Sequence, residues 1–321
     1  IFSFNVIHVG VDERPRESWA GSPKIIEFMK KNNLNTFEEV QDFYMNNIIN
    51  TLKKNNKIIS FSALLICFSC SDVSENAVNE TQWDAINTTF YNEFMECTAG
   101  ENFNEESVAE MIQSWRNLGL SEDLMGAWGY APATDENSSP NGLWELQWTS
   151  KESADNAWAQ FNDSEEANAW SNKYSNVMQC DGDNRDAFSF IFPYDPNAFG
   201  EPAENGYFAS GFVPCILNDG KTRDDFTQAL IAYNLWLDSI DESDVVGTYA
   251  YGVYFPEDPE DQIDFWWGNF DESFDTKKLS NQLWSEKAGE TKVILDETFS
   301  CEKPELFHSQ VFYDPTRPDF S

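Results

Sequence analysis

Two adjacent carboxylates, Asp12 and Glu13, follow an apolar segment at residues 4–10 that is typical of a β-strand. Helical periodicity with a Ser-Pro start covers residues 22–52, and residues 57–59 then show a second strand pattern. Strand, helices and strand together predict a βα unit with both carboxylates at the C-terminal end of its first strand. Catalytic groups of β/α barrels lie at that end, so the pair is a candidate acid–base site.

The residues around this pair resemble a motif of glycoside hydrolase family 20, the β-N-acetylhexosaminidases, whose barrel carries His-x-Gly-Gly-Asp-Glu at a strand end. His8, Gly10, Asp12 and Glu13 match that motif, and Val11 stands at the second glycine. The resemblance implies that Glu13 protonates the glycosidic oxygen. It also implies that Asp12 orients the substrate's N-acetamido group as that group attacks the anomeric carbon. Such chemistry needs one protonated carboxyl beside an ionised one.

The resemblance ends near residue 59, where the family pattern continues with Gly-Trp-Asp-Glu and this chain has Ser-Phe-Ser-Ala at 60–63. A quarter of a barrel cannot enclose a sugar. We therefore expect residues 1–59 to be a partial, non-catalytic β/α-barrel fragment joined to a second protein. The alternative, in which the motif is functional, makes the chain a β-N-acetylhexosaminidase.

An export-signal pattern occupies residues 53–70: a basic head, an apolar run too short to span a bilayer, and Ser69-Cys70 at its end. Met45 is a candidate start for it. The pattern resembles a bacterial lipoprotein processing site and implies a lipid at Cys70. We assign residues 60–84 to this segment and a linker, and we expect an exported, periplasmic or outer-membrane-anchored protein. A buried strand or helix is the alternative.

Charge divides the chain at the same place. Residues 1–70 carry 8 Lys+Arg against 7 Asp+Glu, whereas residues 71–321 carry 12 against 49. Nucleic-acid binding needs cations to neutralise phosphate, so this acidity excludes that class of partner. Anionic lipid surfaces are excluded for the same reason, which leaves a lipid anchor as the one expected membrane attachment.

Most of the chain consists of two divergent copies, residues 85–200 and 205–321. Cys97 recurs as Cys215 after 118 residues, and Cys180 recurs as Cys301 after 121. Each copy has the element order βαββαβ. Strands are expected at 89–97, 124–131, 143–148 and 186–192, with helices at 105–118 and 153–174, and again at 206–215, 246–254, 262–267 and 306–313, with helices at 223–240 and 276–288.

The βαββαβ order is the ferredoxin-like split unit, in which the first and last strands are antiparallel neighbours. The end of the first strand then lies beside the start of the last. We therefore predict the disulfides Cys97–Cys180 and Cys215–Cys301, each within one copy, as an even number of cysteines in an exported domain suggests.

Two such units in tandem usually pack sheet against sheet and resemble the dimeric α/β-barrel superfamily with both halves in one chain. The expected fold class is α+β: two ferredoxin-like units forming a pseudo-dimeric, monomeric barrel behind a β/α fragment. That superfamily includes cofactor-free monooxygenases, haem enzymes and binding proteins, so the resemblance does not select among them.

Strand aromatics are the remaining candidate site. Trp128, Trp148, Tyr251 and Trp267 are expected either to line a pocket for a small apolar or aromatic ligand or to form the core. The chain has two histidines, and no cofactor or metal is expected. The leading hypothesis is an exported, non-enzymatic binding or interaction protein, and a cofactor-independent monooxygenase is the alternative.

Overall fold

The computed structural model describes residues 6–8, 29–31, 58–60 and 88–321. The chain divides into two compact units, Ile1–Asn79 and Glu80–Ser321. In the first unit, β1 (Val6–His8) pairs in parallel with β2 (Ile58–Ser60). Parallel strands require a crossover connection, so this pairing agrees with the βα unit expected from the sequence.

The second unit is mixed α+β and rich in sheet. Its first half contains β3 (Thr89–Ala99), α3 (Glu105–Arg116), β4 (Leu124–Pro132), β5 (Gly142–Trp148), α4 (Lys151–Asp163), α5 (Glu165–Tyr174), β6 (Met178–Cys180) and β7 (Asp186–Ile191). Its second half contains β8 (Tyr207–Leu217), α6 (Arg223–Asp238), β9 (Tyr249–Pro256), β10 (Phe265–Asp271), α7 (Phe274–Lys287), α8 (Gly289–Thr298), β11 (Phe299–Cys301) and β12 (Glu305–Tyr313).

Caps explain where the helices differ from the sequence expectation. The helix expected at 153–174 is divided at Ser164, which ends α4 and whose hydroxyl accepts the Ala167 amide to begin α5. Helix α7 begins two residues earlier than expected because Ser273 and Thr276 form a capping box ahead of it. The short strands β6 and β11 and the helix α8 were not expected.

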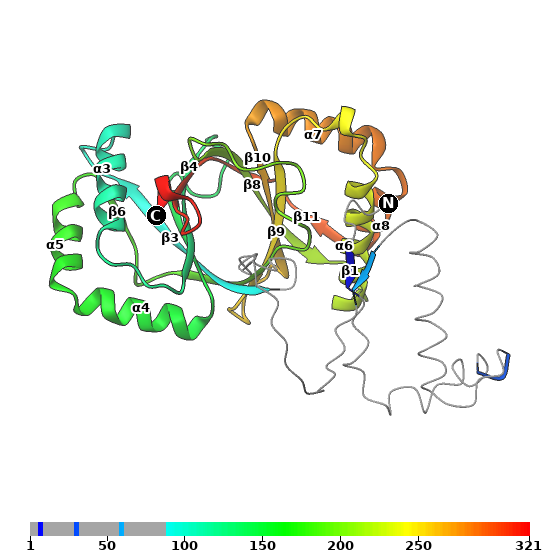
Figure 1. Cartoon of the computed structure of the whole chain (residues 1–321), viewed down its shortest axis with the longest axis horizontal. Helices are drawn as coiled ribbons and strands as arrows, with labels where there is room; N and C mark the ends of the chain where they lie inside the picture. Colours follow the sequence, from blue (N-terminus) through cyan, green and yellow to red (C-terminus); the bar gives the residue numbers. More distant parts are fainter. Residues whose placement is uncertain (1–5, 9–28, 32–57, 61–87) are drawn as a thin grey trace, which may run out of the picture. The chain divides into compact units, whose positions relative to one another are not determined.

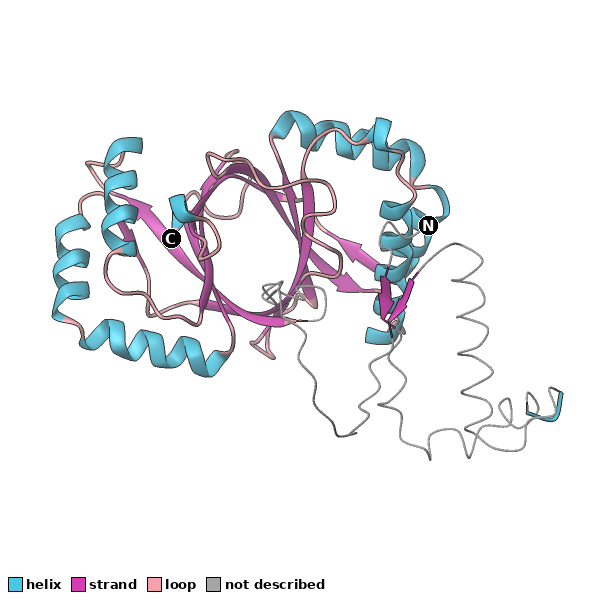
Figure 2. Ribbon diagram, in the orientation of Figure 1, coloured by secondary structure: helices cyan, strands magenta, loops and turns pink. Residues whose placement is uncertain are grey.

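Eight strands form one closed barrel in the order β10-β9-β7-β3-β5-β4-β12-β8, and β8 pairs back onto β10. The ring of strands is visible in Figure 2, with α3–α5 outside one half and α6–α8 outside the other. The expectation of one sheet packed against another is corrected here. The edge strands of the two halves join through β4–β12 and β7–β9, because unpaired edges are satisfied by each other.

Side chains alternate between two environments along every barrel strand. One cluster of apolar side chains lies between the first half's strands and α3–α5, and a second lies between the other strands and α6–α8. A third, aromatic cluster lines the barrel interior. Gly252 and Gly268 make room for it, since a Cβ at either position would stand 2.3 and 2.9 Å from interior rings.

Both predicted disulfides, Cys97–Cys180 and Cys215–Cys301, are confirmed. The second cysteine of each pair lies on a short strand, β6 or β11, that precedes the last long strand of its half. The two bonds indicate an oxidising, extracellular compartment. Among the described helices, none has the length and apolarity needed to span a membrane.

Candidate functional site

The barrel interior is lined by rings from strands of both halves. Its buried members are Phe90, Phe94, Tyr130, Phe190, Phe212, Tyr254 and Phe307. Most contacts between these rings are edge to face, at centroid distances of 5.2–6.0 Å; for example, Tyr130 and Phe212 are 5.2 Å apart. Such packing excludes water, and any charged group placed within it is strongly desolvated.

One carboxyl group, that of Glu145 on β5, lies in this interior with 1% of its surface exposed. Asn92 Nδ2 on β3 donates to its Oε1 at 2.5 Å, and the Tyr130 hydroxyl on β4 donates to its Oε2. The Tyr254 hydroxyl on β9 is a third donor. The carboxyl group is therefore held by three neutral donors, one of which comes from the other half of the barrel.

The two tyrosines occupy equivalent positions in the two halves. In the first half, Cys97 is the strand partner of Gly142, the first residue of β5. In the second half, the equivalent Cys215 is the strand partner of Phe265, the first residue of β10. The strands β5 and β10 can therefore be aligned from their first residues. Tyr130 then pairs with the second residue of β5, and Tyr254 with the second residue of β10. In the same alignment Gly268 stands where the first half has Glu145, so the two equivalent hydroxyls converge on a single carboxyl group.

Burial raises the pKa of Glu145 to about 7, although the hydrogen bonds from Tyr130, Asn92 and Tyr254 lower it. Burial and the neighbouring carboxylate raise the pKa of Tyr130 and of Tyr254 well above the usual value, so both remain donors at neutral pH. Asn92 serves either form of the acid, because its amide donates to the carboxylate and, rotated, accepts from the carboxylic acid. The group can thus gain and lose a proton near neutrality.

A cavity of about 190 Å³ adjoins this carboxyl group. Glu145, Tyr130 and Tyr254 line it together with the rings of Trp128, Phe192 and Phe208. Among the described residues Arg317 is the one basic side chain in its lining, and its Nη2 donates to the Ala203 carbonyl at 2.8 Å. The cavity therefore offers aromatic walls, a buried acid that titrates near neutrality and a cation near the chain's C-terminal segment.

The four aromatic residues predicted to share a pocket do not do so. Trp128 lines the barrel cavity, whereas Trp148 lines a cavity outside the first half and Trp267 one outside the second. Tyr251 stacks on Trp267 at 4.8 Å in the outer cluster of the second half. The structural alignment equates Tyr251 with Ala127, one residue before Trp128, and a shift of one residue places a side chain on the opposite face.

Asp12, Glu13 and Cys70 lie outside the described residues. The described strand β1 ends at His8, four residues before Asp12. His308 on β12 packs edge to face on Phe274 at 5.0 Å and lines none of the three cavities described here. Within residues 88–321 and the other described ranges, no group of three or more His, Cys, Asp or Glu could hold a metal ion.

Sequence reasoning missed Glu145 and its donors. The available signal was a charged residue in the middle of β5, flanked directly by the large apolar residues Trp144 and Leu146. A charge in a buried strand needs partners, so a residue of this kind indicates a candidate site from the sequence alone.

Solved structures with similar folds have low identity to this chain. A candidate monooxygenase from Lactobacillus acidophilus NCFM is 8% identical, with a TM-score of 0.43 over 70% of this chain and 94% of its own. Chlorite dismutase from Candidatus Nitrospira defluvii in complex with imidazole is 9% identical, with a TM-score of 0.40 over 69% and 90%. An anthrone oxidase-like protein is 13% identical, with a TM-score of 0.41 over 69% and 91%.

No curated protein matches the chain significantly. The sequence profile of the catalytic domain of glycosyl hydrolase family 20 matches residues 1–186. This confirms the family resemblance recognised in residues 1–59, and the match extends further than that segment, through β3–β6. It includes Asp12 and Glu13 and covers more than half of the sequence. The chain therefore belongs to glycosyl hydrolase family 20.

Proposed function

We propose that the barrel binds a small, flat, apolar aromatic molecule between its two halves and that Glu145 exchanges a proton with it. One observation carries this proposal: a fully buried carboxyl group with a pKa of about 7 adjoins an aromatic cavity. A general base is most effective when its pKa lies near the working pH. The hydroxyls of Tyr130 and Tyr254 are then free to donate to an anion that forms on the bound molecule.

The enzymatic form of this proposal is a cofactor-independent oxygenase. Glu145 removes a proton from an acidic C–H group, and dioxygen oxidises the resulting carbanion. Anthrone is a suitable probe because it is flat and apolar and has an acidic methylene group. Its reaction balances as anthrone plus dioxygen giving anthraquinone plus water, with dioxygen as the oxidant.

Oxygen consumption with anthrone tests this proposal. We expect the protein to accelerate the reaction above the buffer rate and Glu145→Gln to lower the acceleration by about 100-fold or more. Trp267→Phe, outside the barrel, is the matched control and should leave the rate unchanged. Binding of anthrone without faster oxidation would assign the barrel to the non-enzymatic binding class instead, and no binding at all would refute both forms.

Each half is, we infer, a ferredoxin-like unit, and the barrel is a pseudo-dimer within one chain. Strand order supports this: β7-β3-β5-β4 in the first half and β12-β8-β10-β9 in the second place the four long strands of each half in the order fourth, first, third, second. Sedimentation at micromolar concentration should then give a monomer. We propose the domain bounds 85–200 and 205–321 for these two units.

A second candidate function is β-N-acetylhexosaminidase activity through Asp12 and Glu13. The match to the family's catalytic domain supports it, as does the parallel β1–β2 pair, whose first strand ends four residues before Asp12. A chromogenic N-acetylglucosaminide is the test. Turnover that is lost in Glu13→Gln and retained in Glu145→Gln would assign this activity to the N-terminal motif, and no turnover by the unmodified chain would exclude it.

Export with a lipid on Cys70 is a further proposal, supported by the apolar run before that cysteine and by the two disulfides. Mass spectrometry of the protein expressed in a bacterial host tests it. A diacylglycerol adduct absent from Cys70→Ser supports the anchor, and an unmodified peptide containing Cys70 refutes it.

A further inference from the structure

A cavity of about 750 Å³ lies outside the barrel in the first half, between its strands and α3–α5. Large apolar side chains line it, among them Met111, Trp115, Trp144, Trp158 and Trp170. This volume is in the range of pockets that enclose drug-sized molecules. Within the described part of the chain, Asp183 is the one charged side chain in its lining.

One hydrogen-bond donor in this cavity lacks an acceptor. Trp144 is 4% exposed, and its Nε1 has no hydrogen-bond partner among the described residues. The neighbouring indoles differ: Trp158 donates to Glu93 at 2.7 Å, and Trp170 donates to the Met111 carbonyl at 3.1 Å. A buried N–H group without an acceptor loses its hydration and gains nothing in return.

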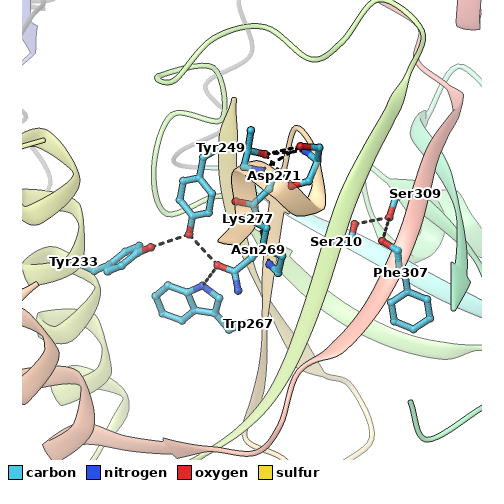
Figure 3. Close-up of polar contacts among 11 residues, drawn as sticks. Ser210, Tyr233, Tyr249, Trp267, Asn269, Asp271, Lys277, Phe307 and Ser309 are labelled. Atoms are coloured by element: carbon cyan, nitrogen blue, oxygen red, sulfur yellow. Dashed lines mark hydrogen bonds and ion pairs between the residues drawn. The ribbon is translucent and has the colours of Figure 1, made fainter. Parts of the chain in front are cut away.

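The second half shows what normally satisfies this donor. In the alignment of β5 with β10, Trp144 corresponds to Trp267, whose Nε1 donates to Asn269 Oδ1 at 3.2 Å. Tyr249 donates to the same oxygen at 2.9 Å and is linked to Tyr233 at 2.7 Å, as Figure 3 shows. The first half has Leu146 at the position of Asn269, so the acceptor is missing there and the donor remains.

The two halves also differ in the volume of the cavity next to the tryptophan. The corresponding cavity of the second half measures about 230 Å³ and is lined by the linked side chains Tyr233, Tyr249 and Asn269. The cavity of the first half is about three times as large, and its wall includes Trp144, whose Nε1 has no acceptor among the described residues. A ligand with an acceptor oxygen and a large apolar group could accept the hydrogen bond of Trp144 and fill the cavity.

We propose that this outer cavity binds a neutral, largely apolar molecule with a carbonyl oxygen that accepts the hydrogen bond of Trp144 Nε1. A carboxylate ligand does not fit, because no Lys or Arg of the described ranges lines the cavity and the chain carries a net charge of −36. This site is separate from the barrel interior and independent of the function proposed for Glu145.

The neutral naphthyl ketone prodan is a direct probe, since its emission reports both the polarity around the molecule and hydrogen bonding to its ketone. We expect the full chain to bind prodan and Trp144→Phe, which keeps a ring but removes the N–H, to bind it about tenfold more weakly. Dimethylaminonaphthalene, which lacks the ketone, should bind both proteins with nearly equal affinity. Trp267→Phe is the matched control in the second half and should bind prodan as the unmodified chain does.

Ala157→Phe provides a second variant that does not involve the donor. Ala157 lines the cavity from α4, and a phenyl ring there should fill the space and abolish binding of both probes, with folding checked by thermal unfolding. Equal affinity of Trp144→Phe and the unmodified chain for prodan would overturn the proposal. Failure of the unmodified chain to bind prodan would overturn it as well, as would loss of binding in Glu145→Gln, which would place the probe inside the barrel.

Discussion

In the first half of the barrel, Trp148 and Ala154 occupy the positions that Asp271 and Lys277 occupy in the second. Trp148 and Asp271 lie on equivalent strands, two residues before the serine that caps the next helix, and Ala154 and Lys277 lie four residues after that cap. The first half thus has an indole and a small side chain in its outer apolar cluster, whereas the second half buries an ion pair of 3.0 Å. The two halves share the same strand register, helix caps and disulfide position, which we call the common frame. The side chains between the strands and the helices differ between the halves.

The largest expected effect is the loss of stability on removing a disulfide, and it tests whether the two halves depend equally on the common frame. Replacing both cysteines of one disulfide by alanine should lower the free energy of unfolding by about 4–5 kcal/mol, because each bond closes a long loop. The sequence separations are 83 and 86 residues, so Cys97/Cys180 and Cys215/Cys301 variants should lose nearly the same amount. Denaturant unfolding measures both. A loss of unfolding free energy in only one of the two variants would show that the two halves do not depend equally on their disulfides.

Breaking the buried ion pair of the second half should have the next largest effect on stability. Lys277→Ala leaves the Asp271 carboxylate, which is 2% exposed, without its cation, and should cost about 3–5 kcal/mol. Burial already raises the pKa of Asp271, and Lys277 lowers it, so the variant should also become less stable as pH rises. The double change Asp271→Trp with Lys277→Ala copies the first half and should recover most of the loss. A double variant as unstable as the single one would mean that the exchange depends on surrounding side chains.

Inside the barrel the two halves differ at Glu145 and its equivalent, Gly268. The folded-state pKa of Glu145, about 7, lies above its ordinary value of 4.5, so its stabilising contribution is full below about pH 4.5 and is lost as pH rises towards 7. Glu145→Gln removes this dependence. Relative to the unmodified chain, it should gain about 3 kcal/mol in unfolding free energy between about pH 4.5 and pH 8. A pH-independent difference would place the pKa of Glu145 near its ordinary value.

The smallest effect concerns the two equivalent tryptophans. Trp267→Phe removes a hydrogen bond to Asn269, whereas Trp144→Phe removes a donor without an acceptor among the described residues. Both lose similar ring area, so Trp267→Phe should be the more destabilising by about 1 kcal/mol in the absence of ligand. Thermal unfolding of the two variants side by side gives this difference. A larger loss of stability in Trp144→Phe than in Trp267→Phe would contradict the conclusion that Trp144 Nε1 has no acceptor.

Most of the frame follows from the sequence, because each long strand and helix carries its own pattern. The strand expected at 89–97 is β3, and the helix expected at 105–118 is α3, with ends that differ by two residues. The cysteine pairing followed from element order alone. Helix α8 was not expected because its apolar residues, such as Leu295, are few and Val293 and Ile294 remain exposed.

The candidate site was less predictable, since it depends on register between strands far apart in the sequence. Aligning Trp128 with Tyr251 is one residue away from the structural alignment, and that single residue moves a side chain from the barrel interior to the outer face. The convergence of Tyr130 and Tyr254 on Glu145 likewise requires knowing that the two halves close into one ring. No local pattern contains that information.

The seams β4–β12 and β7–β9 join the halves by backbone pairing, and both disulfides lie within a half. Within residues 88–321, no covalent cross-link other than the chain itself therefore ties one half to the other. Two molecules can exchange halves and form the same seams between chains, with each resulting barrel made from the first half of one and the second half of the other. Such domain-swapped dimers should accumulate when the protein refolds at high concentration, and each would contain two complete barrel interiors.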